Sequence, residues 1–358
     1  MWVISHSMNL DIFSSPDKFA EVFKHGLANL LHDYNELGVF ILVLANVSLD
    51  SLLHEKLERK VKGRYQLLRR SFKRSPRSFY LDDARDDMQV FRKLLRIGMI
   101  GLQPTEFRDD GPWELQFNQL RSFRPSRIAD RKVEGIFAPF DIDGFHFNKP
   151  FLLKEIFWEG PLAGRRTSLY YNKFPFMPFH SLMVPERGAC HPQYLYQDDL
   201  EYLWVVAELM GQTLPDVGFG YNSYGANASI NNLHFHMFLR DKPLPIMRQE
   251  WSHNGGSEEY PVGCCRFTSV QDAWEFISGL HRQEVSYNLV VLPGCIYCVP
   301  RRRQGSYCHA EWNTGFAWYE VAGGITTVRH DDYISLNAEL ICQEMELLML
   351  HDCSCDPA

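Results

Sequence analysis

The spacing of hydrophobic residues changes near residue 98, from a helical period to a strand-like one. Apolar side chains recur every three or four residues from Asp17 to Tyr34, which predicts an amphipathic helix. The apolar run from Val39 to Val47 predicts a buried strand. From Lys56 to Arg77 cationic and apolar residues are interleaved, which predicts an amphipathic helix with a solvated face. A cationic lip that attracts an anionic substrate or a partner is the alternative for this segment. We therefore expect a mostly helical region over residues 1–98.

Beyond this region the pattern predicts short strands broken by Gly, Pro and Asp, with separate helices. The expected strands are 113–117, 132–140, 145–158, 167–172, 180–184, 287–293, 296–300, 317–320 and 325–328. The expected helices are 197–211, 272–283 and 336–350. A Gly/Asn-rich loop is expected over 218–227. This order is typical of an α+β domain, which we place at residues 99–358.

The most regular alternation runs from Ser229 to Phe238 and contains two histidines one residue apart. On a strand, successive side chains point to opposite faces. One face should enter a core and carry Leu233, Phe235 and Met237. The other should carry Asn232, His234, His236 and Phe238. Two histidines on one strand face lie roughly 7 Å apart, too far for a mutual hydrogen bond but suited to two contacts with one ligand.

The residues before this strand are suited to holding a phosphate group. The small-residue loop Gly220–Asn227, with Asn222 and Gly225, allows main-chain N–H groups to approach an anion closely. Ser229 could add a hydroxyl group. A neutral imidazole beside this loop can attack phosphorus. The alternatives are a structural role for the two histidines and a metal site.

Composition narrows the classes of protein. A net charge of -7 argues against a dedicated nucleic-acid binder. No apolar run reaches the length of a membrane span, and the N-terminus has no secretory pattern. A chain of 358 residues does not need disulfide staples, so its nine cysteines are expected to be reduced in the cytoplasm.

The cysteines also bear on metal binding. Cys295 and Cys298, with Cys308-His309 nearby, resemble half of a zinc site. Three residues apart on a strand, Cys295 and Cys298 should face opposite sides. Cys353 and Cys355 lie in a tail that we expect to be frayed. We expect no metal and no cofactor.

The segment Asn232–Phe238 resembles the histidine-triad signature, His-φ-His-φ-His-φ-φ, with asparagine at the first histidine. More closely, Gly220–Phe235 resembles the GDP-hexose phosphorylase family (GDP-L-galactose and GDP-D-glucose phosphorylases). Further stretches agree in the same order: Arg124-Pro125, Pro139–Asp141, Phe145–Lys149, His180–Pro185, Pro192-Gln193, Pro243–Ile246, Tyr287–Val290 and Trp318–Gly323. The resemblance spans about residues 100–335.

This resemblance implies a histidine-triad-like fold of antiparallel sheet and flanking helices, and a double displacement on a nucleotide sugar with inorganic phosphate. On the family register His234 is the nucleophile, because Ser229 falls at the serine position five residues earlier. The resemblance also implies that Phe145, Asn148 and Lys149 border the nucleotide cleft, and that His180 lies beside the active site. His191 has a weaker claim. It further raises the expectation of a homodimer, since related histidine-triad proteins often pair.

Two departures from the family pattern keep other functions open. The phosphorylases carry glutamine at the position of His236, and histidine there is typical of the hydrolytic branch. Asn232 replaces a histidine that helps to orient the nucleophile; an amide can still hydrogen-bond a backbone carbonyl or a ring nitrogen, so the orienting role can survive, whereas a proton-relay role cannot. The alternatives to phosphorolysis are a hydrolase that forms a nucleoside monophosphate, a nucleotide-binding regulatory protein without turnover, and a metal-binding protein.

Overall fold

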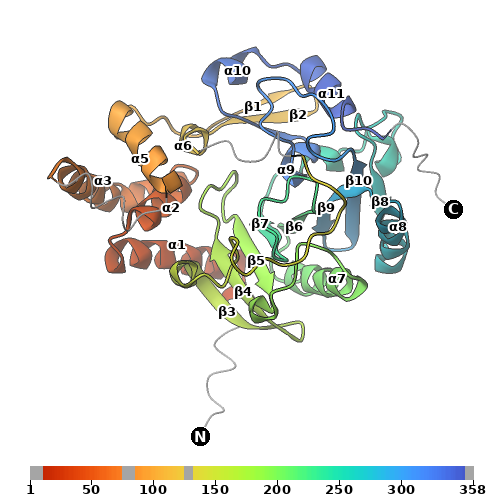
Figure 1. Cartoon of the computed structure of the whole chain (residues 1–358), viewed down its shortest axis with the longest axis horizontal. Helices are drawn as coiled ribbons and strands as arrows, with labels where there is room; N and C mark the ends of the chain where they lie inside the picture. Colours follow the sequence, from red (N-terminus) through yellow and green to blue (C-terminus); the bar gives the residue numbers. More distant parts are fainter. Residues whose placement is uncertain (1–10, 75–84, 125–131, 351–358) are drawn as a thin grey trace, which may run out of the picture.

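A computed structural model describes residues 11–74, 85–124 and 132–350 of the chain. Figure 1 shows the N-terminal helices gathered on one side, strands at the centre, and the C-terminal segments packed above them. The expected mixture of antiparallel sheet, flanking helices and a helical N-terminal region is confirmed.

The N-terminal region is helical wherever it is described. After the 3₁₀ turn η1 (Asp11–Phe13) its helices are α1 (Pro16–Asp33), α2 (Leu37–Val47), α3 (Ser51–Arg74) and α5 (Arg85–Ile97). The Ser15 hydroxyl accepts a hydrogen bond from the Lys18 amide at 3.1 Å and caps α1, with Pro16 in the first turn. The helix expected at 17–34 is therefore confirmed.

The apolar run at 39–47 is helix α2, so the expected strand is wrong. Every residue from Val39 to Val47 is buried, and α2 packs against α1, α3 and α5. A helix enclosed on all sides has no polar face, so its sequence loses the helical period. A short continuous apolar run is then indistinguishable from a buried strand by pattern alone.

Helix α3 has the amphipathic character that its sequence predicts. Its inner face carries Leu57, Val61, Tyr65 and Leu68, which are buried, while Lys62 pairs with Glu58 on the exposed face. Residues 75–77 of the expected helix lie outside the described residues. Whether this face attracts an anionic partner stays a prediction.

The centre of the molecule is an antiparallel sheet of eight strands (Figure 1). In spatial order the strands are β3 (Ile156–Leu162), β4 (Arg165–Tyr171), β5 (Ser181–Pro185), β7 (Phe235–Leu239), β6 (Val217–Asn222), β9 (Ser286–Leu292), β10 (Cys295–Arg301) and β8 (Cys265–Phe267). The strands expected at 167–172, 180–184, 287–293 and 296–300 are confirmed.

A second sheet of three strands contains β1 (Glu106–Asp110), β2 (Trp113–Phe117) and β11 (Gly324–Thr327). β2 pairs antiparallel with β1 and parallel with β11. The strands expected at 113–117 and 325–328 are confirmed, whereas β1 was not expected.

The remaining helices are α6 (Gln119–Ser122), α7 (Gln197–Gly211), α8 (Val270–Arg282), α9 (Trp318–Val321), α10 (His330–Ser335) and α11 (Ala338–Glu346), with 3₁₀ turns η2 (Pro150–Glu155), η3 (Arg187–Ala189), η4 (Pro245–Met247) and η5 (Ser252–Asn254). Helix α7 has the bounds that the sequence predicts, and α8 matches the helix expected at 272–283. The helix expected at 336–350 is shorter in the structure, where α11 begins after Asn337, whose side chain accepts a hydrogen bond from the Leu340 amide, and ends at Glu346.

Four further expectations are wrong in whole or in part. Residues 317–320 form the start of helix α9, in which the Glu320 carboxylate accepts a hydrogen bond from the Ala317 amide at 3.1 Å. The loop expected at 218–227 begins as strand β6. The strand expected at 132–140 is absent from the described residues, and at 145–158 only Ile156–Trp158 belong to a strand. The irregular segment 132–149 contributes Phe147 to a small core with Tyr170 and Val184, so its apolar residues serve packing without a strand.

Two hydrophobic cores lie on opposite faces of the large sheet. One contains Phe235 and Met237 together with side chains of α7, α8 and the N-terminal helices. The other contains Phe238 and Val290 together with the small sheet, α9 and α11. No helix in the described part of the chain is both long and apolar enough to cross a membrane.

Candidate active site

The two histidines lie on the sheet face that the alternation predicts. Leu233, Phe235 and Met237 enter the helix-covered core, while Phe238 enters the opposite core. Strand β7 begins at Phe235, so His234 is the residue immediately before the strand. The rings of His234 and His236 are 5.3 Å apart between centroids, closer than the strand rise alone implies, and tilted by 56°. The two imidazoles can therefore face one ligand.

The orientation of His234 is set by its own main chain. Its Nδ1 lies 2.8 Å from the carbonyl oxygen of Asn232. A carbonyl can only accept, so Nδ1 carries the proton and Nε2 keeps its lone pair. The Nε2 atom has no hydrogen-bond partner among the described residues. This is the tautomer that a nitrogen nucleophile requires.

Burial keeps this imidazole neutral. His234 is 2% exposed, and burial lowers its pKa to about 4, although the hydrogen bond to the Asn232 carbonyl acts in the opposite direction. At neutral pH almost no His234 is protonated. Its lone pair is therefore available without prior loss of a proton.

Asn232 acts through both its side chain and its main chain. Its Oδ1 accepts a hydrogen bond from the Phe147 amide at 3.1 Å, and its Nδ2 donates to the His191 carbonyl at 3.0 Å. Its side chain thus fixes two neighbouring segments, while its carbonyl orients His234. The Phe147 ring lies 5.2 Å from the His234 ring. The imidazole is thus oriented by the main-chain carbonyl of Asn232, and the side-chain amide has no hydrogen bond to it among the described residues.

Gln193 holds the main chain of His234, a role that the sequence did not reveal. Its Oε1 accepts from the His234 amide at 3.0 Å, and its Nε2 donates to the Asn222 carbonyl at 2.9 Å. One buried side chain thereby joins β6 to the residue that precedes β7. Pro192-Gln193 was noted only as part of the family resemblance. No local pattern connects residue 193 to residue 234.

His180 is completely buried and contacts His236. His180 Nε2 lies 2.8 Å from His236 Nδ1, and Asn172 Nδ2 lies 3.1 Å from the same Nε2. The pKa values of both imidazoles are far below the usual range, mainly because of burial, with the positive charge of Arg121 as a further cause. The structure thus brings the predicted His180 to the histidine pair.

Trp318 forms one wall beside His236. Its ring is 5.9 Å from His236 and stacks on Phe238 at 5.2 Å with an angle of 10°. Gly220 is paired with His236 across β6 and β7, and a Cβ atom at Gly220 would lie 2.1 Å from Trp318. Only glycine leaves room for this indole, which explains a glycine inside a strand.

The loop after β6 is organised around Asn222. Its Oδ1 accepts hydrogen bonds from Asn288 Nδ2 and from the Trp318 amide, both at 2.7 Å. Gly225 has φ +87, and a Cβ there would meet Ser286 Oγ at 2.5 Å. These residues keep the loop tight. Their contacts are structural, and phosphate binding by them stays a prediction.

The other predicted site residues occupy the segment that crosses this face, or the loop before His234. Asn148 donates to the Arg187 carbonyl and accepts from Arg187 Nη1 at 3.0 Å, so it holds that arginine. Lys149 Nζ donates to the Ile142 carbonyl at 3.0 Å. Phe145 and Ser229 are exposed, and Ser229 makes no hydrogen bond to His234 among the described residues. His191 has an exposed side chain and contributes through its carbonyl.

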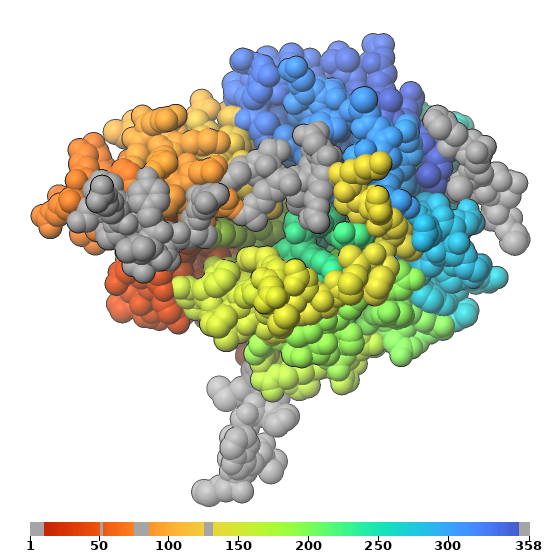
Figure 2. Space-filling model, viewed as in Figure 1, coloured from red at the N-terminus to blue at the C-terminus, as the bar shows by residue number. Residues whose placement is uncertain are grey.

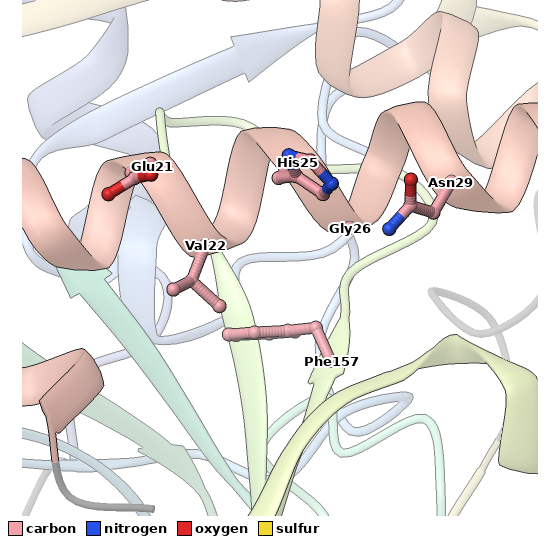
Figure 3. Close-up of a pocket in the computed structure, with 6 residues that line it drawn as sticks. All are labelled: Glu21, Val22, His25, Gly26, Asn29 and Phe157. Atoms are coloured by element: carbon pink, nitrogen blue, oxygen red, sulfur yellow. The ribbon is translucent and has the colours of Figure 1, made fainter. Parts of the chain in front are cut away.

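Figure 2 shows a hollow on this face of the molecule, with the green of the central strands at its base and the yellow segment after residue 131 along one side. A separate pocket of about 280 Å³ lies between α1 and β3 (Figure 3). It is lined by Glu21, Val22, His25, Gly26, Asn29 and Phe157. None of these residues contacts the histidines, so the pocket is not part of this site.

Metal coordination has little support from the geometry. Across residues 11–74, 85–124 and 132–350 no three His, Cys, Asp or Glu side chains are placed to hold an ion. Cys295 and Cys298 enter different cores, on opposite faces of β10, as expected. Cys308 is exposed, and Cys353 and Cys355 lie outside the described residues.

Parts of the chain are similar to known proteins. Residues 113–238 match the family model described as GDPGP1-like, N-terminal domain. GDP-D-glucose phosphorylase 1 of Danio rerio is 32% identical over 135 residues, which are 37% of this chain and 37% of that protein. The Xenopus laevis protein of the same name is 34% identical over 83 residues, 23% of this chain and 20% of that protein. The chain thus matches 37% of the length of the first relative and 20% of the length of the second.

Solved structures of yeast Ap4A phosphorylase Apa2 are also similar. The complex with Ap4A has a TM-score of 0.45 and 15% identity, covering 75% of this chain and 98% of that chain. The complex with AMP has a TM-score of 0.47 and 15% identity. Within this chain, the family match includes every residue that the sequence analysis assigned to the site, from Phe145 to His236.

Proposed function

We propose that the chain is a nucleotidyltransferase that phosphorolyses a nucleoside diphosphate hexose through a covalent intermediate on His234. The observation that carries this proposal is the hydrogen bond from His234 Nδ1 to the Asn232 carbonyl. It directs an unprotonated Nε2 away from the backbone. The family match and the GDP-D-glucose phosphorylase 1 relatives favour a GDP-hexose as substrate.

The reaction would proceed in two displacements. In the first, His234 Nε2 attacks the α-phosphorus, an N–P bond forms, and the P–O bond to hexose 1-phosphate breaks. In the second, an oxygen of inorganic phosphate attacks the same phosphorus and the N–P bond breaks. The products are hexose 1-phosphate and a nucleoside diphosphate, and the imidazole returns to its neutral form.

Hydrolysis is the second candidate, and His236 is the observation that favours it. His236 Nδ1 lies 2.8 Å from His180 Nε2. In the tautomer in which His236 Nδ1 donates to His180, His236 Nε2 is unprotonated and can take a proton from water.

The low pKa of His236 nevertheless makes it a weak base. Water must lose a proton to attack, whereas phosphate at neutral pH already carries anionic oxygens. Phosphate can therefore accept the nucleotidyl group without a strong general base, whereas water cannot. This difference places phosphorolysis ahead of hydrolysis.

The test is incubation of the purified chain with GDP-glucose and with ADP-glucose, with and without inorganic phosphate, followed by separation of the nucleotides. GDP and glucose 1-phosphate formed only with phosphate support the proposal. GMP formed in either condition indicates hydrolysis. Binding of nucleotide without any product indicates a regulatory protein and contradicts both enzymatic functions.

A further inference from the structure

Two arginines lie close together beside the histidine cluster without a carboxylate partner. Arg121 is in α6 and Arg124 follows it, and neither forms an ion pair within the described residues. The charge of Arg121 is one cause, after burial, of the lowering of the Arg124 pKa to about 10. Two partly buried like charges repel each other, and an anion between them would relieve that repulsion.

The acidic side chain that attracts Arg121 most directly already accepts hydrogen bonds from other groups. Glu320 interacts favourably with Arg121, but its Oε1 accepts from Thr326 Oγ1 at 2.6 Å and its Oε2 accepts from the Ala317 amide at 3.1 Å. Among the described residues it forms no hydrogen bond with either guanidinium. The positive charge of the pair is left for another anion.

Aromatic rings cover the flat faces of both guanidinium groups. Arg121 lies over Phe176 at 5.0 Å and Arg124 over Phe174 at 5.7 Å. Arg121 Nη1 donates to the Phe174 carbonyl at 2.7 Å, and its other N–H groups have no partner among the described residues. These ring contacts leave N–H groups of both arginines to donate, and guanidinium N–H groups are well suited to bind phosphate oxygens.

The ring of Phe176 contacts both Arg121 and His180. Phe176 lies 4.2 Å from the His180 ring, and His180 contacts His236. The charge of Arg121 also acts on both imidazoles. An anion bound at the arginines would thus lie on the His236 side of the histidine pair.

We propose that Arg121 and Arg124 bind the phosphate dianion that is exchanged at His234, a subsite that rests on the proposed function. The same two positive charges would hold the phosphate of the departing hexose 1-phosphate and then the entering inorganic phosphate. Hexose 1-phosphate and inorganic phosphate both carry a phosphate group with two negative charges. Hexose 1-phosphate leaves from the position opposite the N–P bond, and inorganic phosphate attacks from that same position. One subsite therefore serves both displacements.

The test measures equilibrium binding of inorganic phosphate, without turnover, to the full chain and to Arg121→Gln and Arg124→Gln. Loss of a charged donor is expected to weaken binding by about 10- to 100-fold, from the ordinary strength of hydrogen bonds to charged groups. Arg248→Gln is the matched control, since Arg248 pairs with Glu250 on the surface and its loss removes the same charge. Unchanged phosphate affinity in both arginine variants would overturn the subsite.

Two additions keep the result decisive. Arg124→Gln leaves the hydrogen bond of Arg121 to the Phe174 carbonyl intact, so it tests the site if Arg121→Gln unfolds. Glucose 1-phosphate is the second probe and should compete with labelled inorganic phosphate. Failure to compete would contradict a shared subsite.

The outcome is separable from the proposed function. If phosphate binding depends on the arginines but no nucleotide sugar is phosphorolysed, the anion site stands and the proposed function fails. If phosphorolysis proceeds with an unchanged KM for phosphate in both variants, the function stands and the arginine site fails.

Discussion

His180 and His236 share one hydrogen bond, 2.8 Å long, between Nε2 of the first and Nδ1 of the second. Asn172 Nδ2 lies 3.1 Å from the same Nε2 and 3.4 Å from His180 Nδ1. Whichever histidine donates the shared proton, the position of the His236 ring is fixed by a buried partner rather than by the ligand.

We expect His236→Gln to change the acceptor rather than abolish the first displacement. Glutamine can keep a hydrogen bond to His180, but its amide cannot take a proton from water. The ratio of nucleoside diphosphate to monophosphate should rise, as measured by chromatography of products at fixed phosphate. A ratio that falls would mean that His236 assists phosphate rather than water.

Replacing His234 with alanine should abolish nucleotidyl transfer. No other side chain in the described parts of the site has its lone pair held in this way. Mass spectrometry of wild-type protein mixed with GDP-glucose in the absence of phosphate should show one added nucleotidyl group, and His234→Ala should show none. His191→Ala is the control, since that side chain is exposed. Turnover retained in His234→Ala would exclude the covalent mechanism.

The rate of the first displacement should not fall near the ordinary pKa of histidine. Burial lowers the pKa of His234 to about 4, so Nε2 stays unprotonated through weakly acidic conditions. The rate of the first displacement is expected to stay level down to about pH 5 and to fall as the pH approaches the lowered pKa. Single-turnover rates between neutral and acidic pH measure this. A midpoint near the usual value of about 6.5 would contradict it.

Stability must be followed in the same samples. The unfolded chain takes up protons on His234 at about 6.5, whereas the folded chain does so only near the lowered pKa, so stability is full above the first value and declines below it. The decline for this residue alone reaches about 3 kcal/mol. Circular dichroism of the folded fraction separates this loss from loss of the nucleophile.

Asn232→Ala should lower both stability and activity. The Phe147 amide would lose its acceptor in a buried site, which costs about 1–3 kcal/mol, while the His191 carbonyl keeps a second donor in the Leu233 amide. Urea unfolding measures the first effect and turnover of the folded protein the second. Asn29→Ala on the exposed face of α1 is the control and should change neither.

Gly220→Ala tests the close packing of the indole. The added Cβ would meet the Trp318 ring at 2.1 Å, and overpacking of this kind costs about 1–3 kcal/mol. Gly63→Ala in α3 is the matched control, because nothing lies within 4 Å of its position, and alanine there should stabilise by up to about 1 kcal/mol. Equal thermal unfolding temperatures for the two variants would contradict the packing argument.

Helix α7 was predictable because its apolar residues recur on one buried face, and strand β7 because its residues alternate between the two faces of the sheet. Strands β9 and β10 are buried along almost their whole length, and their short apolar runs were also predicted as strands. Helix α2 and helix α9 are buried on every side, so neither shows a period, and both were predicted as strands. The glycines in β6 suggested a loop. In the folded chain, rings from distant segments occupy the space where their side chains would be, and the sequence does not show this.

The residues of the site also divide into those that a local sequence pattern marks and those that it does not. The histidine pair was visible because its members are adjacent on one strand face. Gln193 and Phe147 reach His234 from segments that are far away along the chain, and no local pattern marks them. Contacts between residues that are far apart in the sequence can be identified only from the structure.

The two-residue period of β7 has a consequence for changes in chain length. A deletion or insertion of one residue between Leu233 and Leu239 would exchange the two faces of the strand. His236 would then turn toward the apolar core under α7, and Met237 toward the ligand side. Such a length variant would lose folding and chemistry in one step, so this short segment should tolerate substitution far better than any shift in register.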